Sequence, residues 1–101
     1  MTDFKQRMFY KLLDEIDDVC VVDKVFHEIK KGIVSNIEKI EISTNEDEIK
    51  NYLISLRGIL WDFGLETEGD EVAILEQRVK NGENILMDIQ NYGKELKKFV
   101  A

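Results

Sequence analysis

Residues 56–71 read LRGILWDFGLETEGDE and contain the only tryptophan of the chain, Trp61, shortly before a group of carboxylates. The apolar residues ahead of Gly64 recur at intervals of three and four, which is the spacing of an amphipathic α-helix. A glycine after the last apolar residue is typical of a helix C-terminus, because glycine readily adopts the left-handed backbone conformation that ends many helices. This stretch therefore predicts a helix that ends near Phe63, followed by a turn and an acidic segment.

The start of this helix is marked upstream, where residues 42–48 read ISTNEDE. Ser43, Thr44 or Asn45 can accept hydrogen bonds from the free backbone N–H groups of a helix N-terminus. The acids that follow are favoured in a first turn, because the helix dipole is positive there. The sequence thus predicts a helix that starts at this stretch and runs to about Phe63.

Residues 3–41 carry the same spacing over a longer distance. Apolar residues recur every three or four positions from Phe4 to Ile40, so one helix of about 60 Å fits the pattern. Two helices fit as well, because the sequence VCVV is poor in helix formers and the Asp23 that follows it is a credible N-cap. Of these two alternatives, one long helix or two, we favour a break or kink near residues 20–23.

The choice between one helix and two changes how three aspartates are interpreted. If a helix ends near Cys20, Asp14, Asp17 and Asp18 lie in its last turns, where the helix dipole disfavours negative charge. Asp14 and Asp18 also repel each other at a spacing of four residues. Residues that oppose their local structure without compensation are often functional, so these three form a first candidate site. Cys20 is expected on the apolar side of the first helix, as a buried and inert thiol.

Helical spacing also continues over residues 72–100. Thr67 is a candidate N-cap for this segment, and either KNGEN at residues 80–84 divides it into two helices or Gly82 lets a neighbour pack closely. The whole pattern predicts an all-α antiparallel helical bundle of four or five segments. At this length, residues 1–101 form a single domain.

Trp61 lies off the main apolar face of its helix. At 100° per residue it falls on the opposite side, together with Ile54 and Gly58. Either the helix is central and buries both faces, with Gly58 allowing close packing, or an apolar patch with a charged rim is left for a partner, as in many interface hot spots. The second candidate site consists of Ile54, Trp61, Glu66, Glu68, Asp70 and Glu71, with Asp62 beside them.

The composition narrows the partner classes. The net charge is −7, from 21 acidic and 14 basic residues, which argues against binding to nucleic acid or to anionic membrane because phosphates require a basic surface. No apolar run reaches the about 20 residues of a membrane helix, and no apolar signal segment is expected. The single cysteine excludes an intramolecular disulfide, so a reducing cytoplasm is the expected location.

Catalytic chemistry has little to build on. The one histidine, His27, falls on a polar flank and is expected at the surface, and no P-loop, EF-hand or zinc-ligand pattern occurs. We therefore expect no catalytic residues, no cofactor and no metal. One metal alternative remains, a Mg²⁺ ion held between two acidic helix faces by Asp14, Glu15, Asp18, Glu38 and Glu41.

Three hypotheses follow. The first is a non-enzymatic acidic helical protein that binds and inhibits or neutralises a basic protein partner, as an immunity-type protein does. The second is a homo-oligomeric structural or assembly module, or a secretion chaperone, that self-associates through the Trp61 face. The third and weakest is a Mg²⁺-dependent helical hydrolase.

Overall fold

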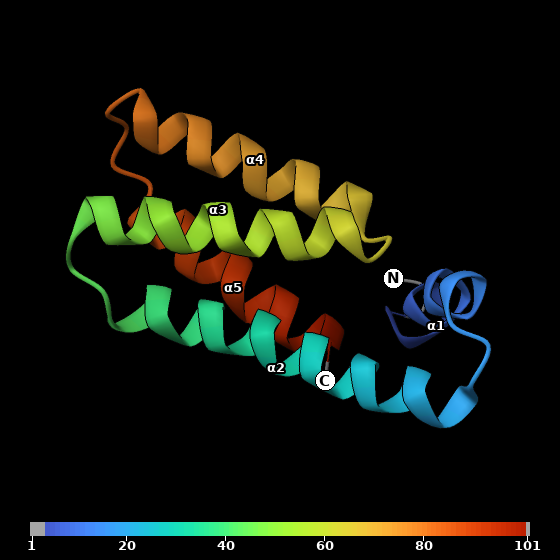
Figure 1. Ribbon diagram of the computed structural model, residues 1–101. Coiled ribbons are helices and arrows are strands. Elements are labelled where there is room, and N and C mark those ends of the chain that lie inside the picture. The colour runs from blue at the N-terminus through green and yellow to red at the C-terminus, as the bar shows by residue number, and fades with distance from the viewer. Residues whose placement is uncertain (1–3, 101) are drawn as a thin grey trace.

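The computed structural model describes residues 4–100, with side chains from Gln6 onward, so residue 3 and the side chain of Phe4 in the predicted first segment lie outside the described part. The chain forms an all-α bundle, as predicted, and it has five helices (Figure 1). The described residues extend over 44 × 21 × 21 Å. The helices are α1 (Phe4–Glu15), α2 (Val19–Ile42), α3 (Glu46–Asp62), α4 (Glu66–Lys80) and α5 (Leu86–Val100).

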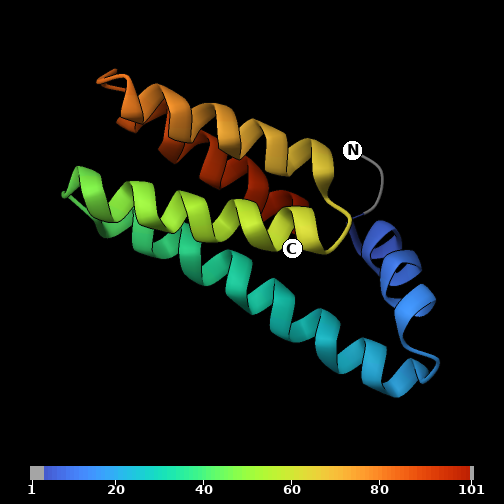
Figure 2. The same ribbon diagram turned by 45° about the horizontal axis from the view of Figure 1, so that its top comes forward.

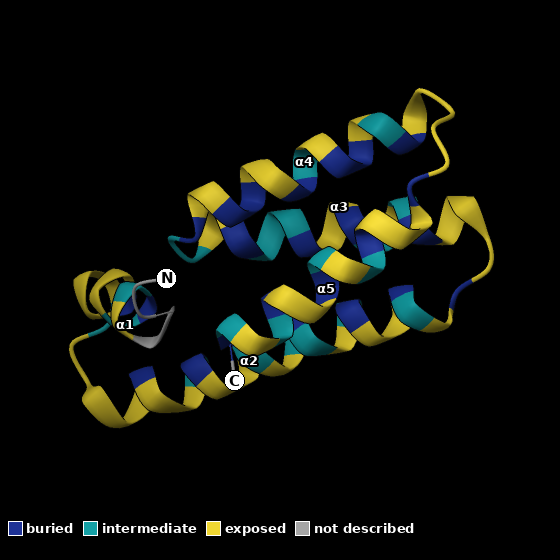
Figure 3. Ribbon diagram, turned by 180° about the vertical axis from the view of Figure 1, so that it is seen from behind, coloured by how far each residue is buried: buried dark blue, intermediate teal, exposed yellow. Residues whose placement is uncertain are grey.

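Helix α3 takes a central position, packed against α2 on one side and α4 on the other (Figures 1 and 2). Helix α5 lies against α2, and the short α1 crosses one end of the bundle. The inward faces of the helices are buried and their outward faces are exposed (Figure 3). The predicted apolar seam of α2 forms much of the core, through Val22, Phe26, Ile29, Ile33, Ile37 and Ile40.

The ends of α3 confirm the prediction from the sequence. The Asn45 carboxamide oxygen accepts hydrogen bonds from the backbone N–H groups of Asp47 and Glu48, at 2.9 and 3.3 Å. At the other end Gly64 has a φ of +84°, and the N–H of Leu65 donates to the carbonyl of Leu60 at 2.8 Å. This is the pattern of a glycine-terminated helix, and it turns the chain so that α4 runs back along α3.

The break between α1 and α2 lies earlier than predicted. Residues 16–18, not 20–23, separate the two helices, and the cap is Asp18, whose Oδ1 accepts from the N–H of Cys20 at 2.9 Å. Asp23 lies inside α2. Low helix propensity at residues 19–22 is overridden because Val22 packs into the core, with no exposed surface. Cys20 lies on the other side of α2 and is exposed, so the predicted buried thiol is wrong.

Two further predictions concern α4. It begins directly after Leu65 without a side-chain cap, so the predicted cap at Thr67 is wrong. The predicted break at residues 80–84 is confirmed, because Gly82 has a φ of +81° in the turn between α4 and α5. No atom lies within 4 Å of a Cβ built at Gly82, which excludes the alternative that this glycine serves close packing.

Candidate binding surface

The aspartates of the first candidate site separate into two kinds. Asp18 has a structural role, since it caps α2 and lies at the positive end of the helix dipole. Asp14 lies in the last turn of α1 and Asp17 in the turn that follows, and both are exposed. Neither makes an ion pair with another described residue. Asp14 and Asp17 therefore remain charges without a structural role in the described chain, whereas Asp18 has a structural role as a cap.

Trp61 packs on α4 and remains 40% exposed. Its ring covers the backbone at Gly69 so closely that a Cβ built there lies 2.2 Å from the ring atom Cδ1. Its indole Nε1 donates to Oδ1 of Asp70 at 3.0 Å, and the guanidinium carbon of Arg57 lies 5.0 Å from the ring centroid. The glycine that permits close packing is thus Gly69 on the next helix. No atom lies within 4 Å of a Cβ built at Gly58.

The remaining members of the second candidate site differ in exposure. Glu66, Asp70 and Glu71 are exposed at the start of α4, and Ile54 is 36% exposed, two turns before Trp61 on α3. Glu68 is only 7% exposed and does not belong to the rim.

The side chain of Glu68 forms an ion pair with Arg7 of α1. Its Oε1 lies 3.0 Å from Nη2 of Arg7, and Nη1 donates to Oε2 at 3.1 Å. Nη2 also donates to the carbonyl of Gly64 at 3.4 Å. The hydroxyl of Tyr92, on α5, donates to the main-chain carbonyl of Glu68 at 3.2 Å. These bonds fasten α1 and α5 to the corner between α3 and α4.

Burial of Tyr92 raises the pKa of its hydroxyl, and the negative charges of Glu71 and Glu68 raise it further. The neutral form of this side chain is therefore the one that the fold accommodates.

Sequence reasoning missed a second buried carboxylate. Glu76 of α4 is 2% exposed and binds Arg57 of α3 through its Oε2, while Nζ of Lys80 lies 3.2 Å from its Oε1. The spacing of four between Glu76 and Lys80 was visible in the sequence. The partner on α3 lies 19 positions away, and local spacing gives no signal for it.

The fold brings both candidate sites to one end of the bundle. The α1–α2 turn and the α3–α4 turn lie at the same end, where α1 packs (Figures 1 and 2). Residues 6–18 and 62–71 together contain nine acidic and two basic residues, a net charge of −7. The whole chain has the same net charge, so the other residues balance to zero. We call these two segments the acidic end.

The two basic residues of the acidic end are already paired. Arg7 binds Glu68, and Nζ of Lys11 lies 3.9 Å from Oε1 of Glu15. Asp62, the last residue of α3, makes no ion pair with a described residue and opposes the dipole of its helix as Asp14 does. The acidic end thus presents carboxylates that no cation of the described chain neutralises.

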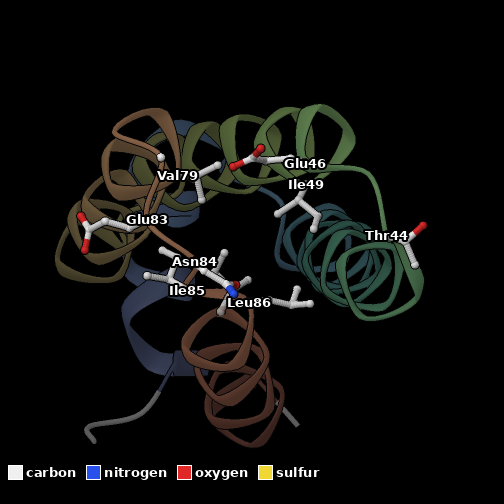
Figure 4. A pocket seen from close by; sticks show the side chains of 10 residues that line it. Thr44, Glu46, Ile49, Val79, Glu83, Asn84, Ile85 and Leu86 are labelled. Atoms are coloured by element: carbon white, nitrogen blue, oxygen red, sulfur yellow. The ribbon is translucent and has the colours of Figure 1, made fainter.

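The opposite end of the bundle contains an open cavity of about 320 Å³ between the α2–α3 and α4–α5 turns (Figure 4). The residues that line it include the aliphatic Ile49, Val79 and Ile85 and the polar Glu46 and Asn84. The polar residues that line it are Thr44, Glu46, Glu83 and Asn84.

The described residues do not form the Mg²⁺ site of the metal alternative. Glu41 lies near the end of α2 that is farthest from Asp18, and its carboxylate accepts from Lys97 of α5 at 2.9 Å. Within residues 4–100 no three His, Cys, Asp or Glu side chains are grouped so that they could hold a metal ion. His27 is exposed, as expected, with its Nε2 3.7 Å from Oδ2 of Asp23.

No protein-family model matches this sequence, and no curated protein and no solved structure matches it either. Among helices α1 to α5, none is both long enough and apolar enough to cross a lipid bilayer.

Proposed function

We propose that this protein binds a basic protein partner through its acidic end and that it inhibits or neutralises that partner, without catalysis of its own. The observation that carries this proposal is the segregation of charge, in which one end of a small bundle holds a net charge of −7 and the rest is neutral. Fields of this kind accelerate encounter with an oppositely charged protein and weaken as salt rises.

The contacts of Trp61 support an interface at this end. Its ring is held in place by Gly69, Asp70 and Arg57 and still exposes 40% of its surface. A side chain that is already ordered loses little conformational entropy when a partner covers it. Trp61 thus supplies an apolar anchor. The carboxylates beside it mimic the phosphate groups that a basic protein binds.

The proposed location is the cytoplasm. Cys20 is exposed, and an exposed free thiol persists as a thiol in a reducing compartment.

The test is an affinity capture from an extract of the native host, with the tagged protein as bait at low and at high salt. We expect a basic protein in equal proportion, released as the salt is raised. A variant that carries Asp14→Asn, Asp17→Asn, Asp62→Asn and Glu66→Gln should lose it. The matched control changes charge equally at other exposed positions, through Glu38→Gln, Asp47→Asn, Glu83→Gln and Glu95→Gln, and should retain it. Capture that resists salt, or that survives the first variant, contradicts the proposal.

A second candidate function is self-association, and exposed apolar side chains near the α1–α2 turn favour it. Tyr10 is 64% exposed and Val19 62%, and Leu13 and Val21 lie near them in the sequence with 40% and 42% exposed. Two copies could bury these side chains against each other. Sedimentation at high micromolar concentration tests this function, and a strictly monomeric protein would contradict it.

A further inference from the structure

Helices α2 and α3 lie close together at the turn that joins them and diverge toward the acidic end (Figures 1 and 2). Where they diverge, an open groove of about 380 Å³ lies between the first half of α2 and the last turn of α3. Its walls are the side chains of Val25, Ile29, Ile59 and Phe63, and the backbone at Gly32. The groove is thus an apolar surface that the bundle leaves incompletely filled.

The absence of a side chain at Gly32 keeps the groove open. A Cβ built at Gly32 lies 3.5 Å from Cδ1 of Ile59, an ordinary contact distance, so a side chain at this position would pack against Ile59 and extend into the groove that Gly32 lines. One turn further along α2, Asn36 lies on the same side of the helix, and its amide donates to the carbonyl of Gly32 at 2.9 Å. The apolar wall therefore stops at Gly32, and the groove has a defined length.

The charges beyond the end of this groove, and not those on its rim, favour a particular occupant. Lys24 and Glu28 lie at its rim, and their charges are opposite, so the rim itself is neutral. Phe63 directly follows Asp62, and α2 begins at the cap Asp18, so both helices lead from the groove into the acidic end. A segment that places an apolar side chain in the groove beside Phe63 has a flanking residue close to the unpaired Asp62, which favours Lys or Arg.

We infer that the groove receives one large apolar side chain, aromatic or branched, from a segment of the basic partner that carries Lys or Arg beside this anchor. This inference rests on the proposed function and deepens it. The carboxylates of the acidic end govern the rate of encounter, and the groove governs how long the complex lasts, because a buried apolar anchor mainly slows dissociation.

The test uses a displayed library of random peptides of about 12 residues, selected on the immobilised full chain. The groove is filled in a variant that carries Gly32→Leu, and Ser35→Leu on the exposed side of α2 is the matched control. Circular dichroism and thermal unfolding verify that both variants fold. We expect enriched peptides that combine Lys or Arg with one aromatic or branched side chain. Their affinity should fall by about tenfold or more for Gly32→Leu and stay unchanged for Ser35→Leu.

The other outcomes separate this inference from the proposed function. Basic peptides that bind Gly32→Leu as tightly as the original chain overturn the groove as anchor site and leave the proposed function intact. Peptides that need the groove but carry no Lys or Arg overturn the inference and count against the proposed function as well. Absence of enrichment overturns the inference, and salt-dependent capture of a basic protein from host extract then decides the proposed function separately.

Discussion

The two ends of the bundle use their acidic residues differently. At the end with the cavity, most acids have structural partners: Arg78 binds Glu83 and Asp88, at 3.2 and 3.4 Å, and the hydroxyl of Ser43 donates to Glu48 at 3.0 Å. At the acidic end, Asp14, Asp17 and Asp62 have no ion-pair partner in the described chain, and Asp14 and Asp62 oppose the dipoles of their helices.

This difference shows which of the many carboxylates are candidates for binding a partner. An acid that caps a helix, or that is buried in an ion pair, is explained by the fold, and it contributes little evidence about partners. At the acidic end, this reasoning sets aside Asp18 and Glu68. The acids without a structural role are the better candidates for binding, and four experiments sharpen the distinction.

The largest effect is expected from Arg7→Met at the acidic end. This change leaves the Glu68 carboxylate, whose side chain is 10% exposed, without its cation. Breaking a buried pair from one side is costly, and because Arg7 is itself 32% exposed we expect a loss of about 2 to 3 kcal/mol in the free energy of unfolding. Urea denaturation measures it. The double variant Arg7→Met with Glu68→Met should recover most of the loss, and equal stability of the single variant and the original chain would show that this pair does not anchor α1.

A smaller effect is expected from two glycines that flank Trp61. Alanine is favoured over glycine in a helix by about 1 kcal/mol, so Gly58→Ala, with open space around it, should raise the free energy of unfolding by that amount or less. Gly69→Ala should lower it by about 2 kcal/mol, because the Trp61 ring must leave its position and its hydrogen bond to Asp70. Thermal unfolding compares the two variants. Stabilisation by both would mean that Trp61 moves aside freely.

Neighbouring aspartates provide the third experiment. Asp18→Ala removes the N-cap of α2 and should cost about 1 kcal/mol. Asp17→Ala should change stability by less than about 0.5 kcal/mol, as is usual at an exposed position without a structural role. Chemical denaturation of the two variants side by side tests whether Asp18 stabilises the fold and Asp17 does not. Equal losses of stability would contradict this distinction.

The last effect, about as large as that of Asp18→Ala, concerns Tyr92 of α5, whose hydroxyl bonds to the main chain at Glu68 of α4. Its pKa is raised above the ordinary value of about 10, so the folded state retains the proton that the unfolded chain releases in alkali. The resulting contribution to stability is complete below about pH 10 and is lost progressively as the pH rises above it.

Tyr92→Phe should cost about 1 kcal/mol at neutral pH through the lost bond to Glu68 and should flatten the alkaline decline. Urea midpoints between about pH 8 and pH 11 measure both, with the exposed Tyr10→Phe as control. A decline as steep in Tyr92→Phe as in the original chain would contradict this assignment.

The helices were predictable because their apolar residues follow one period, and the ends of α3 were predictable because Asn45 and Gly64 act locally. The position of the first break was not. Asp18 and Asp23 are equally good caps by sequence, and burial of Val22 in the core decides between them.

The candidate site was predictable in part for the same reason. Helical phase correctly placed Trp61 off the main face of α3, since phase depends only on spacing. The surface on which its ring packs depends on Gly69 and Asp70 of another helix, and the burial of Glu68 depends on Arg7, 61 positions away. Contacts between distant segments leave no trace in a local pattern.

The environment of Trp61 has a spectroscopic consequence. It is the only tryptophan of the chain, and its indole touches a carboxylate and a guanidinium at the corner of α3 and α4 while part of it faces water. Intrinsic fluorescence excited at the red edge of the tyrosine band therefore reports on this corner alone. A partner that covers the acidic end should shift the emission to the blue, whereas a ligand in the distant cavity should leave it unchanged, so occupancy of one end can be followed without any label.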